Sequence, residues 1–160
     1  MKLSELRDAL AQFERATGSL IPLESCNWRP SVDAHWLDER ADSISGRFGV
    51  YVYAAEDDEI LYIGKAQDSP FEKRIWGHLQ KPDPGRSQSG DRRGLKLYPN
   101  HKWKDQGLDA KAVETVEKGE LTIEALELQP NHVAGLFEIV ALTWCQQEFG
   151  QLPPLNRKLG

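Results

Sequence analysis

The sequence lacks the features of a secreted or membrane-bound protein. No apolar run approaches the roughly 20 residues that a membrane-spanning helix requires. The opening MKLSELRDALAQFERATG has no basic segment followed by an apolar one, so it does not read as a secretion signal. Cysteine is scarce, because only Cys26 and Cys145 are present, far apart and in no metal-binding spacing. We therefore expect a cytoplasmic protein that contacts no membrane, with two reduced structural thiols.

An overall excess of basic residues is also missing. The net charge is −5 and the isoelectric point is near 5.4, which by itself argues against nucleic acid as a partner. Residues 65–104, however, contain ten Lys or Arg and four Asp or Glu, a local charge of +6. A basic segment on an acidic body can still hold a phosphate backbone, because the local field decides contact. Composition alone leaves a solvated, charged loop as an equal alternative.

The pattern along the 160 residues predicts one α+β domain without internal repeats. Apolar residues recur at helical spacing over residues 3–17, and Gly18 would end that helix. Residues 19–46 read as irregular. Aromatic and β-branched residues alternate over 48–53, and a second short run covers 60–63, which predicts an antiparallel hairpin.

Three further segments complete the predicted fold. Ser69, Pro70 and Glu72 are typical of a helix start, and Phe71 and Ile75 begin an apolar stripe that continues to Leu79, before Pro82 ends the helix. Residues 108–118 and 131–149 read as helices, and 121–128 as a third strand. The expected architecture is an α/β sandwich, a small three-stranded antiparallel sheet flanked by helices.

Glu138 is the most informative single residue. It is the only charged residue between Val133 and Leu142, and its neighbours on the same helical face are apolar or small. Burying an unpaired carboxylate costs several kcal/mol, which is a large fraction of the free energy of unfolding of a typical domain. Glu138 should therefore bind a cation or form a salt bridge to Arg or Lys, and the helix alone leaves both open.

Two other groups have residue types that suit phosphate chemistry. Arg74 and His78 share one helical face at a spacing of four, combining a planar donor for phosphate with a group that titrates near neutral pH. Tyr51 and Tyr62 lie on the two strands of the hairpin, and Lys65 follows at the end of the second strand. A solvated basic face and simple cross-strand packing are the plain alternatives.

These residues together resemble the GIY-YIG nuclease superfamily. The matching elements, in order, are Gly49-Val50-Tyr51, Tyr62-Ile63-Gly64-Lys65, Arg74, His78, Glu138 and Pro153-Pro154-Leu155-Asn156. The resemblance covers residues 48–80 and 120–157, and it departs from the pattern at Val50, which replaces Ile. It divides the chain into an N-terminal helix and arm (1–46) and a GIY-YIG domain (47–160) with a basic insertion at about 81–119.

The resemblance implies a metal-dependent endonuclease that leaves 5′-phosphate and 3′-hydroxyl ends. Glu138 would hold one divalent ion, Mg²⁺ or Mn²⁺. Tyr51 or Tyr62 would activate or orient water with help from Lys65, His78 or both, and Arg74 would neutralise the scissile phosphate. Asn156 would fix the geometry of the site. The sequence does not decide which tyrosine acts as the base.

The expected partner is nucleic acid, DNA in the first instance, with a homodimer or a separate specificity protein as a further partner. The residues expected to follow the backbone are basic side chains of the first helix after the hairpin and of the insertion, namely Lys73, Arg86, Arg92, Arg93, Lys96, Lys102 and Lys104. The alternative is a non-catalytic nucleic-acid-binding module with the same fold.

Overall fold

The computed structural model describes residues 1–33, 43–80, 98–99 and 107–157. The elements are α1 (Leu3–Thr17), β1 (Ser25–Trp28), β2 (Val32–Asp33), β3 (Gly49–Ala55), β4 (Ile60–Ala66), α2 (Phe71–His78), β5 (Leu79–Gln80), β6 (Tyr98–Pro99), α4 (Ala110–Lys118), β7 (Leu121–Gln129), the 3₁₀ turn η3 (Asn131–Val133) and α5 (Ala134–Phe149). The α+β class and the helices expected near 3–17, 108–118 and 131–149 are confirmed.

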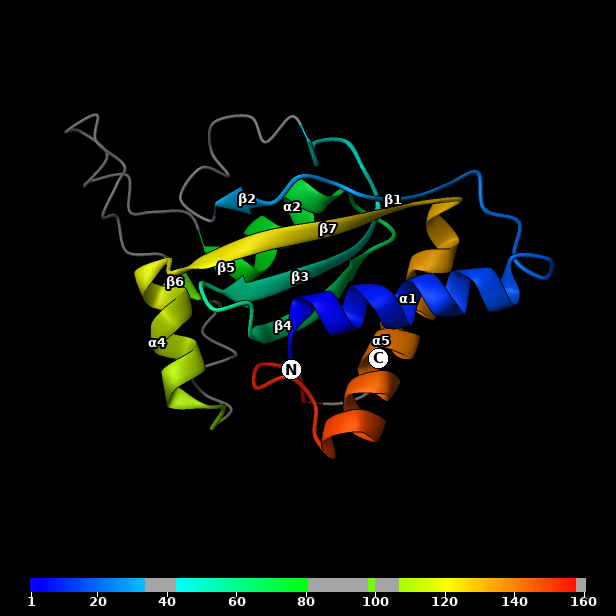
Figure 1. Ribbon diagram of the computed structural model, residues 1–160. Helices are drawn as coiled ribbons and strands as arrows, with labels where there is room; N and C mark the ends of the chain where they lie inside the picture. Colours follow the sequence, from blue (N-terminus) through cyan, green and yellow to red (C-terminus); the bar gives the residue numbers. More distant parts are fainter. Residues whose placement is uncertain (34–42, 81–97, 100–106, 158–160) are drawn as a thin grey trace.

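The main sheet has five strands in the order β1-β7-β3-β4, with β2 beside β1 on the same edge of β7 (Figure 1). Every pairing is antiparallel, and β3 and β4 form the expected hairpin. The expectation of three strands is therefore wrong, since the segment 19–46 supplies β1 and β2. Both are short and largely polar, so no alternation marks them, and their pairing with β7 comes from tertiary contacts.

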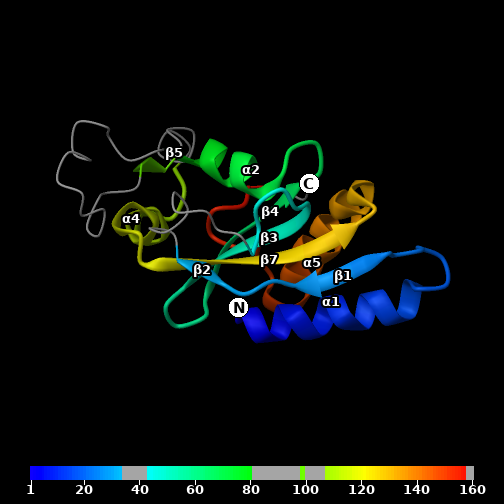
Figure 2. The same cartoon turned by 90° about the horizontal axis from the view of Figure 1, so that it is seen from above.

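Helices cover both faces of this sheet. Apolar residues of α1 and α5 pack with Val50 and Val52 of β3 on one face. On the other face, residues of α2 and α4 pack with Tyr51 and Tyr53 of the same strand. Figure 2 shows α1 and α2 on opposite sides of the sheet, with β4 nearer to α2 than to α1. Helices cover both faces of β3, and side chains alternate between the faces along a strand. Each residue of β3 can therefore contact only the helices on its own face.

Helix α2 is shorter than the sequence predicts. Phe71 and Ile75 are fully buried as expected, but the helix ends at His78. The next two residues form β5, whose Leu79 and Gln80 pair with Pro99 and Tyr98 of β6. This pairing takes Leu79 out of the helix, so the apolar stripe does not continue to it and Pro82 does not end the helix.

Candidate active site

The hairpin places three tyrosines on the α2 face of the sheet. Tyr53 is opposite Tyr62 in the β3–β4 register, and Tyr51 is opposite Gly64. The ring centroid of Tyr62 lies 6.0 Å from that of Tyr51 and 5.4 Å from that of Tyr53. A Cβ atom at Gly64 would lie 2.6 Å from Cζ and 2.7 Å from the hydroxyl oxygen of Tyr51. Glycine at this position therefore makes the room that the Tyr51 phenol occupies.

Of the three phenols, Tyr62 has the environment that best suits chemistry. Tyr51 and Tyr53 are completely buried, and burial raises the pKa of both well above the ordinary value. Burial also raises the pKa of Tyr62 to about 12, a hydrogen bond with Tyr51 lowers it, the Glu138 carboxylate raises it and the Arg74 charge lowers it. Tyr62 is only partly buried. The pKa of Tyr62 thus responds to both the acidic and a basic member of the expected catalytic set.

Glu138 forms a salt bridge with Lys65. Helix α5 packs on the face opposite the tyrosines, and Lys65 of β4 reaches it there, with 2.9 Å between Lys65 Nζ and Glu138 Oε2. The Glu138 side chain is 11% exposed and that of Lys65 is 35% exposed. The salt bridge that the helix pattern left open is present, and its cation belongs to the expected catalytic set.

Gly135 lies next to the side chains of Lys65 and Gln67. A Cβ atom at Gly135 would lie 3.8 Å from Lys65 Nζ and 3.0 Å from Gln67 Oε1. Asn131 further ties this region together, because its side-chain amide donates a hydrogen bond of 2.8 Å to the Gln67 carbonyl. The η3 turn that precedes α5 is thus tied to the residue that follows β4, and the Lys65 ammonium reaches Glu138 near the same end of β4.

Asn156 lies on the free edge of β4. Its side-chain oxygen accepts a hydrogen bond from the Ile63 N–H at 2.9 Å, and its side-chain nitrogen donates one to the Ile63 carbonyl at 2.8 Å. The neighbouring Leu155 N–H donates to the Leu61 carbonyl at 3.0 Å. The segment after α5 therefore pairs with β4 as a strand would, and it holds the backbone between Tyr62 and Lys65 in place.

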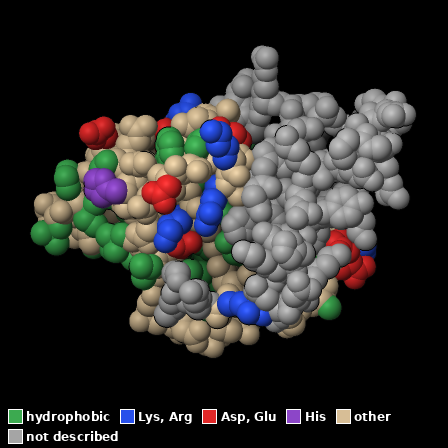
Figure 3. Space-filling view, turned by 180° about the vertical axis from the view of Figure 1, so that it is seen from behind, with side chains coloured by type: hydrophobic (Ala, Val, Ile, Leu, Met, Phe, Trp, Pro, Cys, Tyr) green, Lys and Arg blue, Asp and Glu red, His purple; other side chains and the backbone are tan. Residues whose placement is uncertain are grey.

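The expected phosphate-binding residues are described in part. Arg74 and Lys73 lie on α2 and are exposed, and the Arg74 charge lowers the pKa of all three tyrosines. His78 ends α2, but its side chain is outside the described residues. Arg86, Arg92, Arg93, Lys96, Lys102 and Lys104 also lie outside them. Figure 3 shows the face away from α1, where basic and acidic side chains lie beside hydrophobic ones.

Sequence reasoning missed three buried polar residues. Tyr53 joins the tyrosine cluster, as its place two residues after Tyr51 on the same strand face could have indicated. Glu124 and Glu127 of β7 are 6% and 4% exposed. They are three positions apart on β7 and so face opposite sides of the sheet, and arginines pair with them on both sides.

The donor set at Glu138 fits one loosely held divalent ion. The described residues contain no group of three or more His, Cys, Asp or Glu side chains placed to hold a metal. A single carboxylate is enough for an ion such as Mg²⁺ that keeps most of its waters and also binds substrate phosphate. The Lys65 ammonium sits where a cation meets this carboxylate. A hollow of about 640 Å³ elsewhere, lined by residues including Glu56, Asp109 and Phe149, includes no residue of the expected catalytic set.

Comparisons with protein-family models, curated proteins and solved structures give no significant match to this chain. None of the helices within the described residues has the length and apolar character needed to span a membrane. Any functional assignment consequently depends on the residues and their geometry.

Proposed function

We propose that the chain is a metal-dependent endonuclease of the GIY-YIG type that hydrolyses phosphodiester bonds in DNA. The observation that carries this proposal is the Lys65–Glu138 pair at the edge strand β4, whose carboxylate influences the pKa of Tyr62 on the same strand. A nearly buried carboxylate balanced by one partly exposed ammonium can exchange that ammonium for a divalent ion. Phenols and a guanidinium of the expected types lie around the same strand, β4.

Glu138 would hold the ion, and Mg²⁺ or Mn²⁺ bound there would supply Lewis-acid stabilisation of the leaving 3′-oxygen. Tyr62 is the better candidate for activating or orienting the attacking water, since it is only partly buried, whereas Tyr51 is completely buried. The pKa of about 12 keeps Tyr62 protonated at neutral pH. Neutralising the Glu138 charge removes one cause that raises this pKa.

The remaining residues would act on the phosphate and on the geometry of the site. Arg74, exposed on α2, would place its planar fork on non-bridging phosphate oxygens. Lys65, once released from Glu138, would neutralise the same group, and His78 remains a candidate for proton transfer. Asn156 positions the β4 backbone through its two hydrogen bonds to Ile63. The products would carry 5′-phosphate and 3′-hydroxyl ends.

A plasmid-nicking assay with Mg²⁺ or Mn²⁺ tests the proposal. Glu138→Gln should lower the nicking rate by at least about 100-fold, because it removes the carboxylate that would hold the metal ion. Glu124→Gln is the matched control, since it makes the same change at a similarly buried acid, which pairs with Arg7 at 2.5 Å near α1. Its rate should stay close to that of the wild type, and DNA ligase should reseal the nicks.

Two results would overturn the nuclease proposal. One is equal nicking by the wild type and Glu138→Gln. The other is an inert wild type on duplex, branched and single-stranded DNA and on RNA, with either metal. Binding of those nucleic acids without cleavage would favour the alternative, a binding module with this fold.

A further inference from the structure

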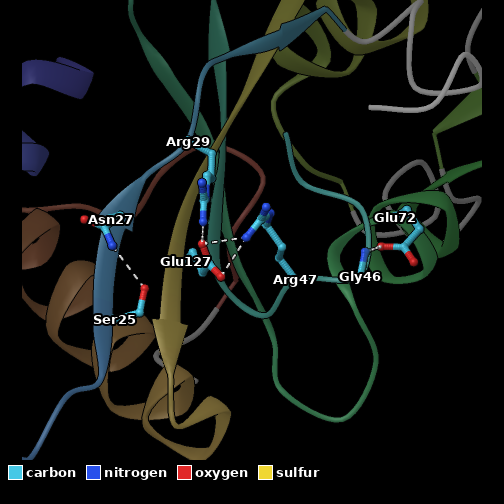
Figure 4. Close-up of polar contacts among 7 residues, drawn as sticks. All are labelled: Ser25, Asn27, Arg29, Gly46, Arg47, Glu72 and Glu127. Carbon is cyan, nitrogen blue, oxygen red and sulfur yellow. Dashed lines mark hydrogen bonds and ion pairs between the residues drawn. The ribbon is translucent and has the colours of Figure 1, made fainter. Parts of the chain in front are cut away.

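A second charged cluster lies at the β7 side of the sheet and is separate from the Glu138 site. It consists of Arg29, Arg47 and Glu127 (Figure 4), hereafter the arginine cluster. The Glu127 carboxylate accepts hydrogen bonds from Nη2 of Arg29 and from Nη1 of Arg47, the latter at 3.0 and 3.2 Å to its two oxygens. Two guanidiniums therefore share one carboxylate.

The backbone holds both arginines in place. The Arg29 N–H donates to the Ala125 carbonyl of β7 at 2.8 Å. The Arg47 carbonyl accepts from the Phe71 N–H at 2.9 Å, at the start of α2. Next to Arg47, the Gly46 N–H donates a hydrogen bond of 3.1 Å to the Glu72 carboxylate of α2 (Figure 4). The cluster is thus built by the sheet edge and by the helix that bears Arg74.

The charges of the arginine cluster do not balance. Among the residues that the structure describes, Glu127 is the carboxylate that pairs with both arginines, so the three side chains together carry a net charge of +1. The Glu127 side chain is 5% exposed, whereas those of Arg29 and Arg47 are 28% and 35% exposed. The negative charge is covered and the positive charge faces outward. Among the described residues, the buried Nε atoms of both arginines have no hydrogen-bond partner.

The chemistry and the location of this excess charge both suit phosphate. Arginine presents a planar set of donors that matches phosphate oxygens, and its charge is retained at any physiological pH. Glu127 is opposite Gly49, which lies two residues before Tyr51 on the same strand, or about 7 Å along β3. One nucleic-acid strand advances about 3.4 Å per nucleotide, so a strand seated at Tyr62 passes the cluster within a few nucleotides.

We propose that Arg29 and Arg47 bind a non-scissile phosphate of the nucleic-acid backbone. The proposal takes its ligand class from the proposed function and adds a contact outside the basic insertion. Glu127 then limits the affinity for phosphate, because it neutralises one of the two positive charges. Removing Glu127 and removing an arginine should consequently change nucleic-acid binding in opposite directions.

Fluorescence anisotropy of a labelled DNA duplex, measured in EDTA over a range of salt concentrations, tests this contact. Arg47→Gln and Arg29→Gln should each weaken binding about tenfold. Each should also reduce the slope of log affinity against log salt by about 0.9, the value for one lost phosphate contact. Glu127→Gln should strengthen binding, because the excess charge rises. Arg7→Gln is the matched control, since Arg7 pairs with a buried acid on the opposite face of the sheet.

The conservative variant Arg47→Lys keeps the charge and should retain the salt slope while losing part of the affinity. Circular dichroism checks that each variant is folded before it is assayed. An unchanged salt slope in folded Arg29→Gln and Arg47→Gln would overturn the proposal, as would weaker binding by Glu127→Gln. Should a folded Arg47→Lys fail to restore the slope lost in Arg47→Gln, the assignment is also wrong.

Two further measurements separate the possible sources of failure. Inorganic phosphate should displace duplex from the wild type more than chloride does at equal ionic strength, and this difference should shrink in Arg47→Gln. An equal effect of both anions would contradict a built phosphate site. Because EDTA prevents metal-dependent cleavage, the contact can be present in a protein that never cuts. If the protein cuts DNA but Arg29→Gln and Arg47→Gln leave the slope of log affinity against log salt unchanged, the phosphate contact is refuted and the proposed function is not.

Discussion

Two acidic side chains beside the same sheet are both nearly buried, yet they are balanced differently. Glu127 is 4% exposed and Glu138 is 9% exposed. Glu127 meets two arginine forks whose backbones are fixed to β7 and α2. Glu138 meets one lysine, which reaches it on a long and partly exposed side chain. Glu127 is paired with two positive charges, whereas Glu138 is paired with one.

This difference indicates which acid can accept a new cation. Displacing an arginine fork from Glu127 would break several charged hydrogen bonds within a fixed frame. Displacing the Lys65 ammonium from Glu138 requires only a change of side-chain conformation, and the released ammonium returns to water. The β4 edge is therefore the region suited to a metal, and the arginine cluster is the region suited to an anion.

The largest expected effect concerns metal affinity. Glu138→Gln should weaken Mn²⁺ binding by at least about 100-fold, more than loss of a supporting residue usually costs. Glu127→Gln should leave Mn²⁺ affinity unchanged, because its neighbours are cations. Electron paramagnetic resonance of free Mn²⁺ measures both. Equal losses in the two variants would remove the distinction between the two acids.

Stability should show the reverse order. Glu127→Gln leaves two guanidiniums facing a neutral amide and should lower the free energy of unfolding by about 2 kcal/mol, reduced from the value for fully buried pairs because both arginines are partly solvated. Glu138→Gln should cost less than about 1 kcal/mol, since Lys65 can turn to water. Urea unfolding of the two variants beside the wild type provides the measurement. A greater loss for Glu138→Gln would mean that Lys65 is not replaceable.

The smallest expected effect is the contribution of Tyr62, on β4, to the pH dependence of stability. The pKa of Tyr62 is about 12 in the folded chain, above its ordinary 10.0. A raised folded pKa contributes stability that is complete below about pH 10 and is lost as pH rises through about 12. Between about pH 9 and about pH 11, the wild type should lose about 1 kcal/mol more than Tyr62→Phe.

Thermal melts over this pH range test the expectation. Both cysteines are free thiols with pKa values raised to about 12, so they also contribute to alkaline destabilisation. Their contribution is the same in the wild type and in Tyr62→Phe, and it cancels in the comparison. Parallel pH profiles for the two proteins would show that Tyr62 is as solvated when folded as when unfolded.

The elements that the sequence predicts are those with a strong local period. The hairpin, β7 and the helices α1 and α4 carry such patterns, α5 is marked instead by apolar residues on all its sides, and the structure confirms all of them. β1 and β2 carry none, since their backbone partners lie on β7, far along the chain. The end of α2 is missed for the same reason, because β6 captures Leu79.

The candidate site divides in a similar way. The type and spacing of Tyr51, Tyr62 and Glu138 can be read from the sequence, because each stands out within its own element. That Lys65 is the cation beside Glu138 follows from how α5 crosses β4, which no local pattern encodes. Glu127 looks like a surface residue in the sequence, and only the arrival of Arg29 and Arg47 from distant segments explains its burial.

The pairing of Asn156 with Ile63 has a consequence for biosynthesis. The two residues are 93 positions apart, so the ribosome completes β4 long before it makes the segment that covers it. At translation rates of about 5–20 residues per second, this interval lasts about 5–20 s. During that time the nascent chain exposes an unprotected strand edge, which can recruit a neighbouring nascent chain or a chaperone.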